Sequence, residues 1–80
     1  MLITLHKAAD YLEEHGWCQR IEHLGERACV WGALKQVADV ETVRLAREAI
    51  VSYTGIPLTI WNDEPGQTVE NVVKTLRSIV

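Results

Sequence analysis

The chain has 80 residues, a formal net charge of −3 at pH 7 and 48% hydrophobic residues. This length and composition are typical of one small globular domain spanning residues 1–80. The absence of any run of Lys or Arg argues against a nucleic-acid partner, and no apolar stretch reaches the ~18 residues of a membrane-spanning helix.

The first half of the chain predicts two helices. Residues 5–15 show apolar spacing of a helix, with Thr4 as a candidate N-cap and Gly16 as a left-handed end. Residues 28–38 begin with a run that is apolar on every side, which predicts a buried, central helix. Gly32 within it indicates that another backbone passes close by. Residues 18–26 have no clear period and are open to a loop or a loose hairpin.

The middle of the chain predicts a third helix. Asp39 is a candidate cap for a helix over 40–54, with Gly55 as its end. Its buried stripe is expected to comprise Val43, Ala46, Ile50 and Tyr53.

The last third of the chain predicts an ordered connector and a final helix. The connector, residues 58–67, contains a type II turn at Glu64-Pro65-Gly66-Gln67. Thr68 then caps a last helix, whose buried face is Val69, Val72, Val73, Leu76 and Val80. The sequence therefore predicts an all-α fold, a compact bundle of four short helices with an ordered connector before the last helix.

Three motifs in order resemble those of a family of small proteins from actinobacteria and their phages, classed as a domain of unknown function. They are Gly-Trp-Cys-Gln at 16–19, Cys-x-x-Gly-Ala-Leu at 29–34 and Trp-Asn-Asp-x-Pro-Gly-x-Thr at 61–68. The stretch between Gln19 and Cys29 is shorter than in many relatives. The resemblance covers nearly the whole chain and implies an actinobacterial or actinophage origin, but it implies no activity and no functional residues.

Three tryptophans, Trp17, Trp31 and Trp61, are a large number for an 80-residue chain. Each buried indole also needs a partner for its N–H. Partial exposure of these side chains, or an interface between two copies in a homodimer, is therefore expected. Trp61 itself is expected to be buried against the central helix near Gly32.

Cysteine and histidine residues raise two chemical alternatives. His15, Cys18, His23 and Cys29 are ligand types for tetrahedral zinc, but their spacing is not that of a zinc finger. Cys18 is also a candidate nucleophile, with His15 or His23 as base and Asn62 or Asp63 as orienting group. It follows a helix C-terminus, however, where the dipole disfavours a thiolate. We expect no metal and no cofactor.

Asn62 and Asp63 beside Trp61 form either a polar site or a scaffold, and short Asn and Asp side chains usually organise turns. Asp63 is therefore expected to bond backbone amides of its own turn. Residues 28–38 and 40–54 also have helix-turn-helix spacing, but the second helix offers only Arg44 and Arg47 as basic contacts.

These observations favour a small cytosolic protein-interaction module, phage-encoded or phage-derived, that binds a host or phage protein. The cytosolic expectation comes from two cysteines that form no disulfide framework and an apolar start too short for a signal peptide. The alternative is a small enzyme or ligand-binding domain that uses Cys18 with Asn62 and Asp63. Trp17, Trp31 and Trp61, with Asn62 and Asp63, are candidates for an interaction motif or a structural motif under either function.

Overall fold

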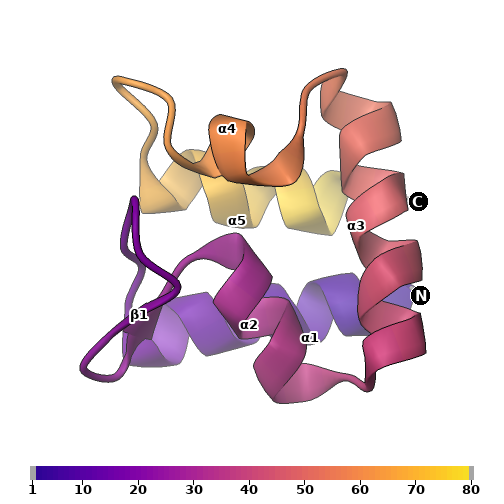
Figure 1. Ribbon diagram of the computed structural model, residues 1–80, viewed down its shortest axis with the longest axis horizontal. Coiled ribbons are helices and arrows are strands. Elements are labelled where there is room, and N and C mark those ends of the chain that lie inside the picture. The colour runs from indigo at the N-terminus through magenta and orange to yellow at the C-terminus, as the bar shows by residue number, and fades with distance from the viewer. Residues whose placement is uncertain (1, 80) are drawn as a thin grey trace.

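The computed structural model describes residues 2–79, which form five helices and a two-stranded antiparallel sheet (Figure 1). The elements in chain order are α1 (Leu2–His15), β1 (His23–Leu24), β2 (Arg27–Ala28), α2 (Val30–Val37), α3 (Val40–Thr54), α4 (Leu58–Asn62) and α5 (Val69–Ser78). The expected helical character is confirmed. The expected number of four helices is corrected to five by α4, which lies within the expected connector. The expected all-α class is approximate, because the chain also forms the β1–β2 hairpin.

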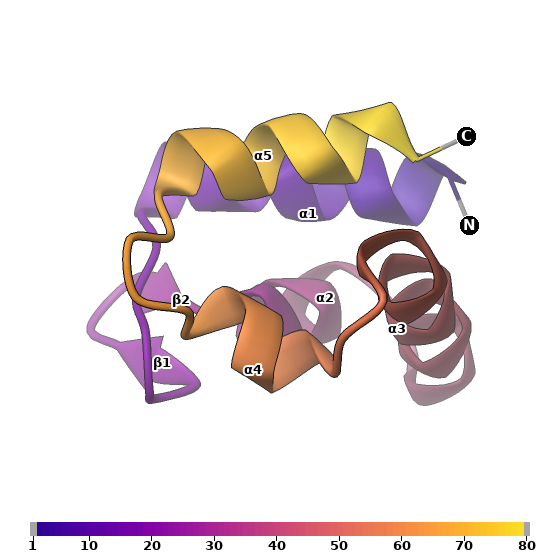
Figure 2. The ribbon, with the colours of Figure 1, turned by 90° about the horizontal axis from the view of Figure 1, so that it is seen from above.

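The helices pack around α1. α1 lies antiparallel beside α5 and also packs closely against α2 (Figure 2). α3 runs across one end of these helices, and α4 covers the far side of α2 (Figure 1). The expected central position of α2 is therefore shared with α1, which makes the larger interfaces. Within residues 2–79, no helix combines the length and the apolarity needed to cross a bilayer.

One buried cluster joins all five described helices, because each contributes an apolar stripe at helical spacing. It comprises Leu5, Ala8, Ala9, Leu12, Ala28, Val30, Ala33, Leu34, Val43, Ala46, Ile50, Leu58, Trp61, Val72, Val73, Leu76 and Ile79. Tyr53 is not part of it, contrary to expectation, since its side chain is 57% exposed. Val80, expected on the buried face of the last helix, lies outside the described residues.

The helix ends follow the local sequence signals. Gly16 and Gly55 have φ angles of 99° and 80°, the left-handed conformation expected of helix-terminating glycines. The side chains of Asp39 and Thr68 accept hydrogen bonds from the third residue beyond each, as N-caps do. Thr4 is not a cap, because α1 already begins at Leu2.

The start of α2 differs from the expected boundary. Ala28 belongs to β2, and Cys29 is the N-cap of α2. The Cys29 sulfur accepts a hydrogen bond from the Gly32 amide at 3.5 Å. The close backbone expected at Gly32 is that of Glu22, whose carbonyl oxygen would lie 2.6 Å from an added Cβ. The space beside Gly32 is thus taken by the segment before β1, where the sequence had suggested Trp61.

Candidate functional site

Asn62 is the centre of a buried polar cluster that connects three parts of the chain. Its side chain is 1% exposed. Its Oδ1 accepts from Trp17 Nε1 at 2.8 Å and from the Val30 amide at 3.0 Å. Its Nδ2 donates to the Cys18 carbonyl at 3.1 Å and to Asp63 Oδ1 at 2.9 Å. Two acceptor and two donor positions are all that a side-chain amide has, so none is left for a ligand.

Asp63 extends this cluster toward the loop after α1. Its Oδ1 accepts from the Arg20 amide at 2.8 Å, where the sequence had suggested amides of its own turn. Arg20 has a φ of 68°, a left-handed conformation uncommon for a residue with a side chain. Gln19 Nε2 donates to the carbonyls of Asn62 and Glu64, at 3.2 and 3.1 Å. These bonds tie the loop 16–20 to the end of α4.

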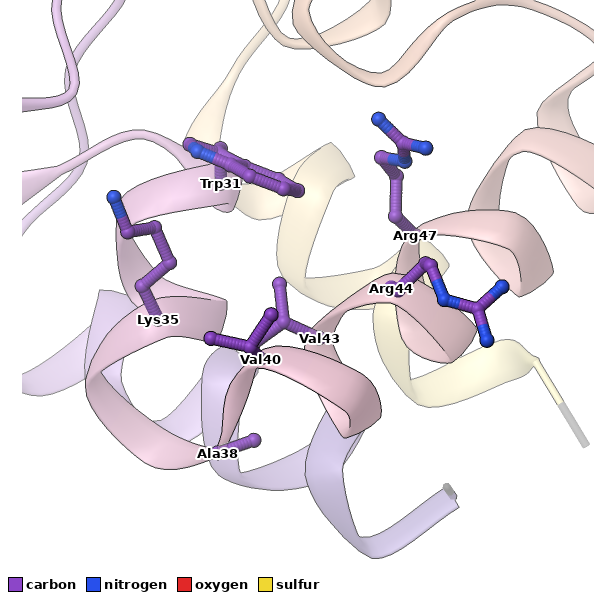
Figure 3. A pocket seen from close by; sticks show the side chains of 7 residues that line it. All are labelled: Trp31, Lys35, Ala38, Val40, Val43, Arg44 and Arg47. Atoms are coloured by element: carbon purple, nitrogen blue, oxygen red, sulfur yellow. The ribbon is translucent and has the colours of Figure 1, made fainter.

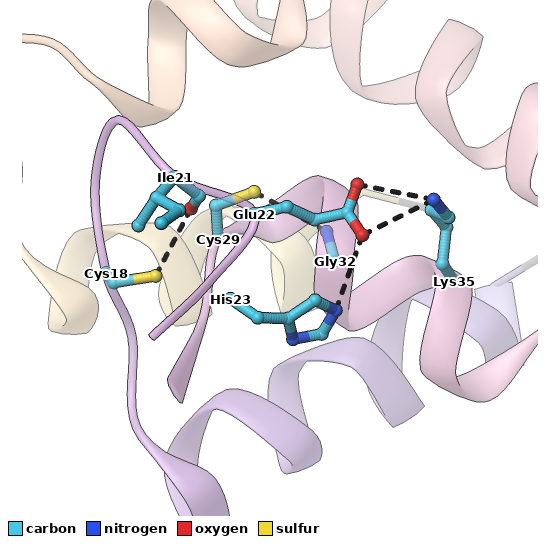
Figure 4. Close-up of polar contacts among 7 residues, drawn as sticks. All are labelled: Cys18, Ile21, Glu22, His23, Cys29, Gly32 and Lys35. Atoms are coloured by element: carbon cyan, nitrogen blue, oxygen red, sulfur yellow. Dashed lines mark hydrogen bonds and ion pairs between the residues drawn. The ribbon is translucent and has the colours of Figure 1, made fainter. Parts of the chain in front are cut away.

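Cys18 is placed where a nucleophile is not activated. Its thiol is 7% exposed and donates to the Ile21 carbonyl at 3.3 Å (Figure 4). Burial raises the pKa of the Cys18 thiol, the nearby Cys29 and Asp63 raise it further, and Arg27 opposes the rise. A raised pKa keeps the sulfur protonated at neutral pH, and the thiol is a much weaker nucleophile than the thiolate.

The histidines are engaged elsewhere. His15 lies against the Tyr11 ring with centroids 4.3 Å apart. His23 Nε2 is 3.4 Å from a Glu22 carboxylate oxygen (Figure 4). Cys29 caps α2, as described above. Within residues 2–79, no three His, Cys, Asp or Glu side chains come together to hold a metal ion, so the four residues of the zinc alternative do not form a ligand set.

The three tryptophans have different environments. Trp61 is 5% exposed, as expected, whereas Trp17 and Trp31 are half-buried. Trp17 lines an open hollow of about 620 Å³ between α1 and α5. Arg77 also lines this hollow, and it pairs with Asp10 at 2.7 Å and with Glu13. Trp31 lines a different and more apolar hollow, formed by residues of α2 and α3.

A groove between α2 and α3 holds Trp31. We name it the α2/α3 groove; it encloses about 330 Å³ and is lined by Trp31, Lys35, Ala38, Val40, Val43, Arg44 and Arg47 (Figure 3). The Arg47 guanidinium lies over the Trp31 ring, and Val40 and Val43 lie below this pair in the view of Figure 3. Val40 is 87% exposed, the highest value among the large hydrophobic side chains whose exposure the structure describes. The groove is therefore an accessible apolar surface with basic residues at its rim.

Sequence reasoning identified Trp31 but not its neighbours in this groove. Arg44 and Arg47 were considered only as weak nucleic-acid contacts. Val40 carried no clear signal, because it is three residues before Val43 and so fits the helical spacing of the buried stripe. Its meeting with Trp31 depends on how α2 and α3 pack, which the sequence pattern does not reveal.

Comparisons with known proteins give one result. Residues 2–79 match the family of unknown function DUF6197. Neither a curated protein nor a solved structure matches the chain.

Proposed function

Because the chain belongs to a family of unknown function, membership assigns it no activity, and we propose from the geometry that it is a protein-interaction module. In this proposal the α2/α3 groove receives a segment of a protein partner. The observation that carries the proposal is the exposure of Val40 in a groove that also holds Arg47 and the half-buried Trp31.

The composition of the groove supports this role. Trp and Arg are the residue types most enriched among those that dominate binding energy at protein interfaces. Covering an exposed apolar side chain such as Val40 is favourable by about 25 cal/mol per Å² of apolar surface removed from water. The groove also lies on two helices of the packed core, so binding does not require ordering of a loop.

The polar residues of the alternative function belong, in this proposal, to the scaffold. The hydrogen-bonding positions of Asn62 are filled by protein groups, and the Cys18 thiol is buried with a raised pKa. Trp17 and Asp63 contribute to the same network. No observation favours an enzyme that uses these residues.

In this proposal the chain is a phage-encoded or phage-derived, cytosolic protein that binds a host or phage protein. The support for this origin is the resemblance of the three motifs. The support for a reducing compartment is that Cys18 and Cys29 are both free thiols.

The test is a comparison of three proteins in affinity capture from an actinobacterial lysate. Val40→Asp places a carboxylate in the groove, at a first helical position where acidic residues are tolerated or stabilising. Ile3→Asp is the matched control, since Ile3 is 69% exposed in the first turn of α1 and lies outside the groove. We expect the wild type and Ile3→Asp to capture the same stoichiometric partner and Val40→Asp to lose it.

Melting temperatures of the three proteins establish that each is folded. The purified partner should then bind the wild type at a 1:1 ratio by calorimetry and change the fluorescence of the half-buried Trp31. A partner that binds Val40→Asp as well as the wild type would contradict the proposed role of the groove.

A further inference from the structure

The charged residues that line the α2/α3 groove are all of one sign. The protein carries a formal net charge of −3, yet Lys35, Arg44 and Arg47 line the groove and, within residues 2–79, no Asp or Glu does. A cation on this face that has no carboxylate partner of its own would attract an acidic group of a partner.

Two of these three cations are already paired. Lys35 Nζ lies 3.2 Å from a Glu22 carboxylate oxygen (Figure 4). Arg44 pairs with Glu41 and, at 2.9 Å, with Glu48, and its guanidinium points away from the groove (Figure 3). The carboxylate partners of both lie outside the groove lining.

Arg47 is the available cation. Among the ion pairs of the described residues it has no carboxylate partner. Its guanidinium carbon is 5.7 Å from the centroid of the Trp31 ring, the range of a cation–π contact. A guanidinium held over an aromatic face keeps N–H donors at its edge, and a carboxylate is its best bidentate acceptor.

We propose that the occupant of the α2/α3 groove is an acidic segment of a protein partner, in which one bulky apolar side chain lies beside an Asp or Glu. This inference rests on the proposed interaction function and names its partner class. The cavity of about 330 Å³ is at the lower end of binding-pocket sizes and suits one or two side chains. The apolar side chain fills the space between Trp31 and Val40, and the carboxylate pairs with Arg47.

Other occupants fit the groove less well. Nucleic acid binding depends on several cations that each meet a phosphate, whereas here one cation is unpaired and the lining between the basic residues is apolar. A second copy of the chain, docked about a twofold axis through the groove, would bring the two sets of basic residues together.

The experiment selects heptapeptides from a random displayed library on the immobilised full chain. Enriched peptides should carry a bulky apolar residue next to Asp or Glu. The best peptide is then synthesised with its acid and with the matching amide, and both are titrated into the wild type and Arg47→Gln. We expect loss of the acid to weaken binding about tenfold in the wild type and less than about twofold in Arg47→Gln.

Two controls isolate the charge of Arg47. Lys74→Gln removes one positive charge from an exposed position on α5 and should behave as the wild type. Val40→Asp should lose the peptide altogether. An equal loss in the wild type and Arg47→Gln would overturn the pairing while leaving the groove as the docking site.

The remaining outcomes separate this inference from the proposed function. Failure to enrich any peptide, or unchanged peptide binding by Val40→Asp, would overturn both. Self-association that Val40→Asp abolishes in sedimentation would identify a second copy as the occupant. Binding of a 20-nucleotide single strand that Arg47→Gln abolishes would identify nucleic acid. Either result would overturn the acidic segment.

Discussion

Asn62 shows how one side chain can determine the relative positions of distant segments. It connects the loop after α1, through Trp17 and the Cys18 carbonyl, to the first amide of α2 at Val30. Each of these groups would be costly to bury without a partner, because an unsatisfied buried donor or acceptor costs about 1–3 kcal/mol. The cluster therefore sets how α4 and the loop 16–20 meet.

Replacing Asn62 by Ala is expected to be among the most damaging single changes. It leaves the Trp17 indole N–H, the Val30 amide and the Cys18 carbonyl without their partner, so we expect a loss of roughly 3 kcal/mol or more of unfolding free energy. Urea denaturation measures it. Asn71→Ala is the matched control, because Asn71 is exposed and should change stability by no more than about 0.5 kcal/mol. Similar losses in both variants would contradict the role of the cluster.

At the scale of elements, α3 shows a helix fixed by local signals. Asp39 Oδ1 accepts from the Thr42 amide at 2.8 Å, and the hydrogen bonds from Thr42 hold the pKa of Asp39 below its ordinary value of 3.8. A folded-state pKa below that of the unfolded chain means that the ionised cap stabilises the fold above the ordinary value. This stabilisation is lost as the pH falls through the folded pKa.

The predicted consequence is a pH dependence of the melting temperature that Asp39→Asn reduces. Asn can still cap the helix but has no charge to lose, so its melting temperature should fall less than that of the wild type as the pH drops below 3.8. Thermal melts by circular dichroism between pH 6 and pH 2 test this. Glu26→Gln, at an exposed position of the hairpin, should retain the wild-type profile. Parallel profiles for the wild type and Asp39→Asn would refute the assignment.

The helices differ in how well the sequence predicts them. α3 and α5 were predictable because a cap, an apolar stripe and, for α3, a terminal glycine all lie within one segment. α4 was not predictable, since Leu58–Asn62 is five residues long and its N-cap residue, Pro57, makes no side-chain cap hydrogen bond. A helix this short is not stable alone and exists only through its tertiary contacts.

Prediction of the hairpin and of the candidate site from the sequence was limited for the same reason, since both depend on tertiary packing. β1 and β2 are two residues each, too short for an alternating pattern, and the hairpin is positioned by the packing of β2 against α1 and α2. In the α2/α3 groove, Trp31 was identifiable as a large aromatic. Its pairing with Arg47 comes from the angle between two helices, which depends on the whole core.

At the scale of the whole molecule, Trp61 holds the second half of the chain to the first. It is 5% exposed in the common core, and the next residue, Asn62, forms the polar cluster. Loss of the indole would therefore loosen α4 and, through it, the loop 16–20. Because one core joins all five described helices, we expect the protein to respond as a single cooperative unit.

Trp61→Ala should lower the unfolding free energy by roughly 3–5 kcal/mol, the range for deletion of a large buried aromatic. Since small domains have about 5–15 kcal/mol in total, the variant should melt at a much lower temperature. Far-UV circular dichroism reports the helices, and fluorescence of the remaining Trp17 and Trp31 reports two different hollows of the fold. The two transitions should coincide in both the wild type and the variant.

Ile60→Ala is the matched control for this change, because Ile60 is the preceding residue of α4 and is 59% exposed. It should alter stability by no more than about 0.5 kcal/mol. A Trp61→Ala protein that retained its helical signal and melting temperature while only Trp17 became exposed would show that α4 is a detachable cover. In that case the α1–α2–α3–α5 packing would be stable without it, and the cooperative single-core description would be wrong.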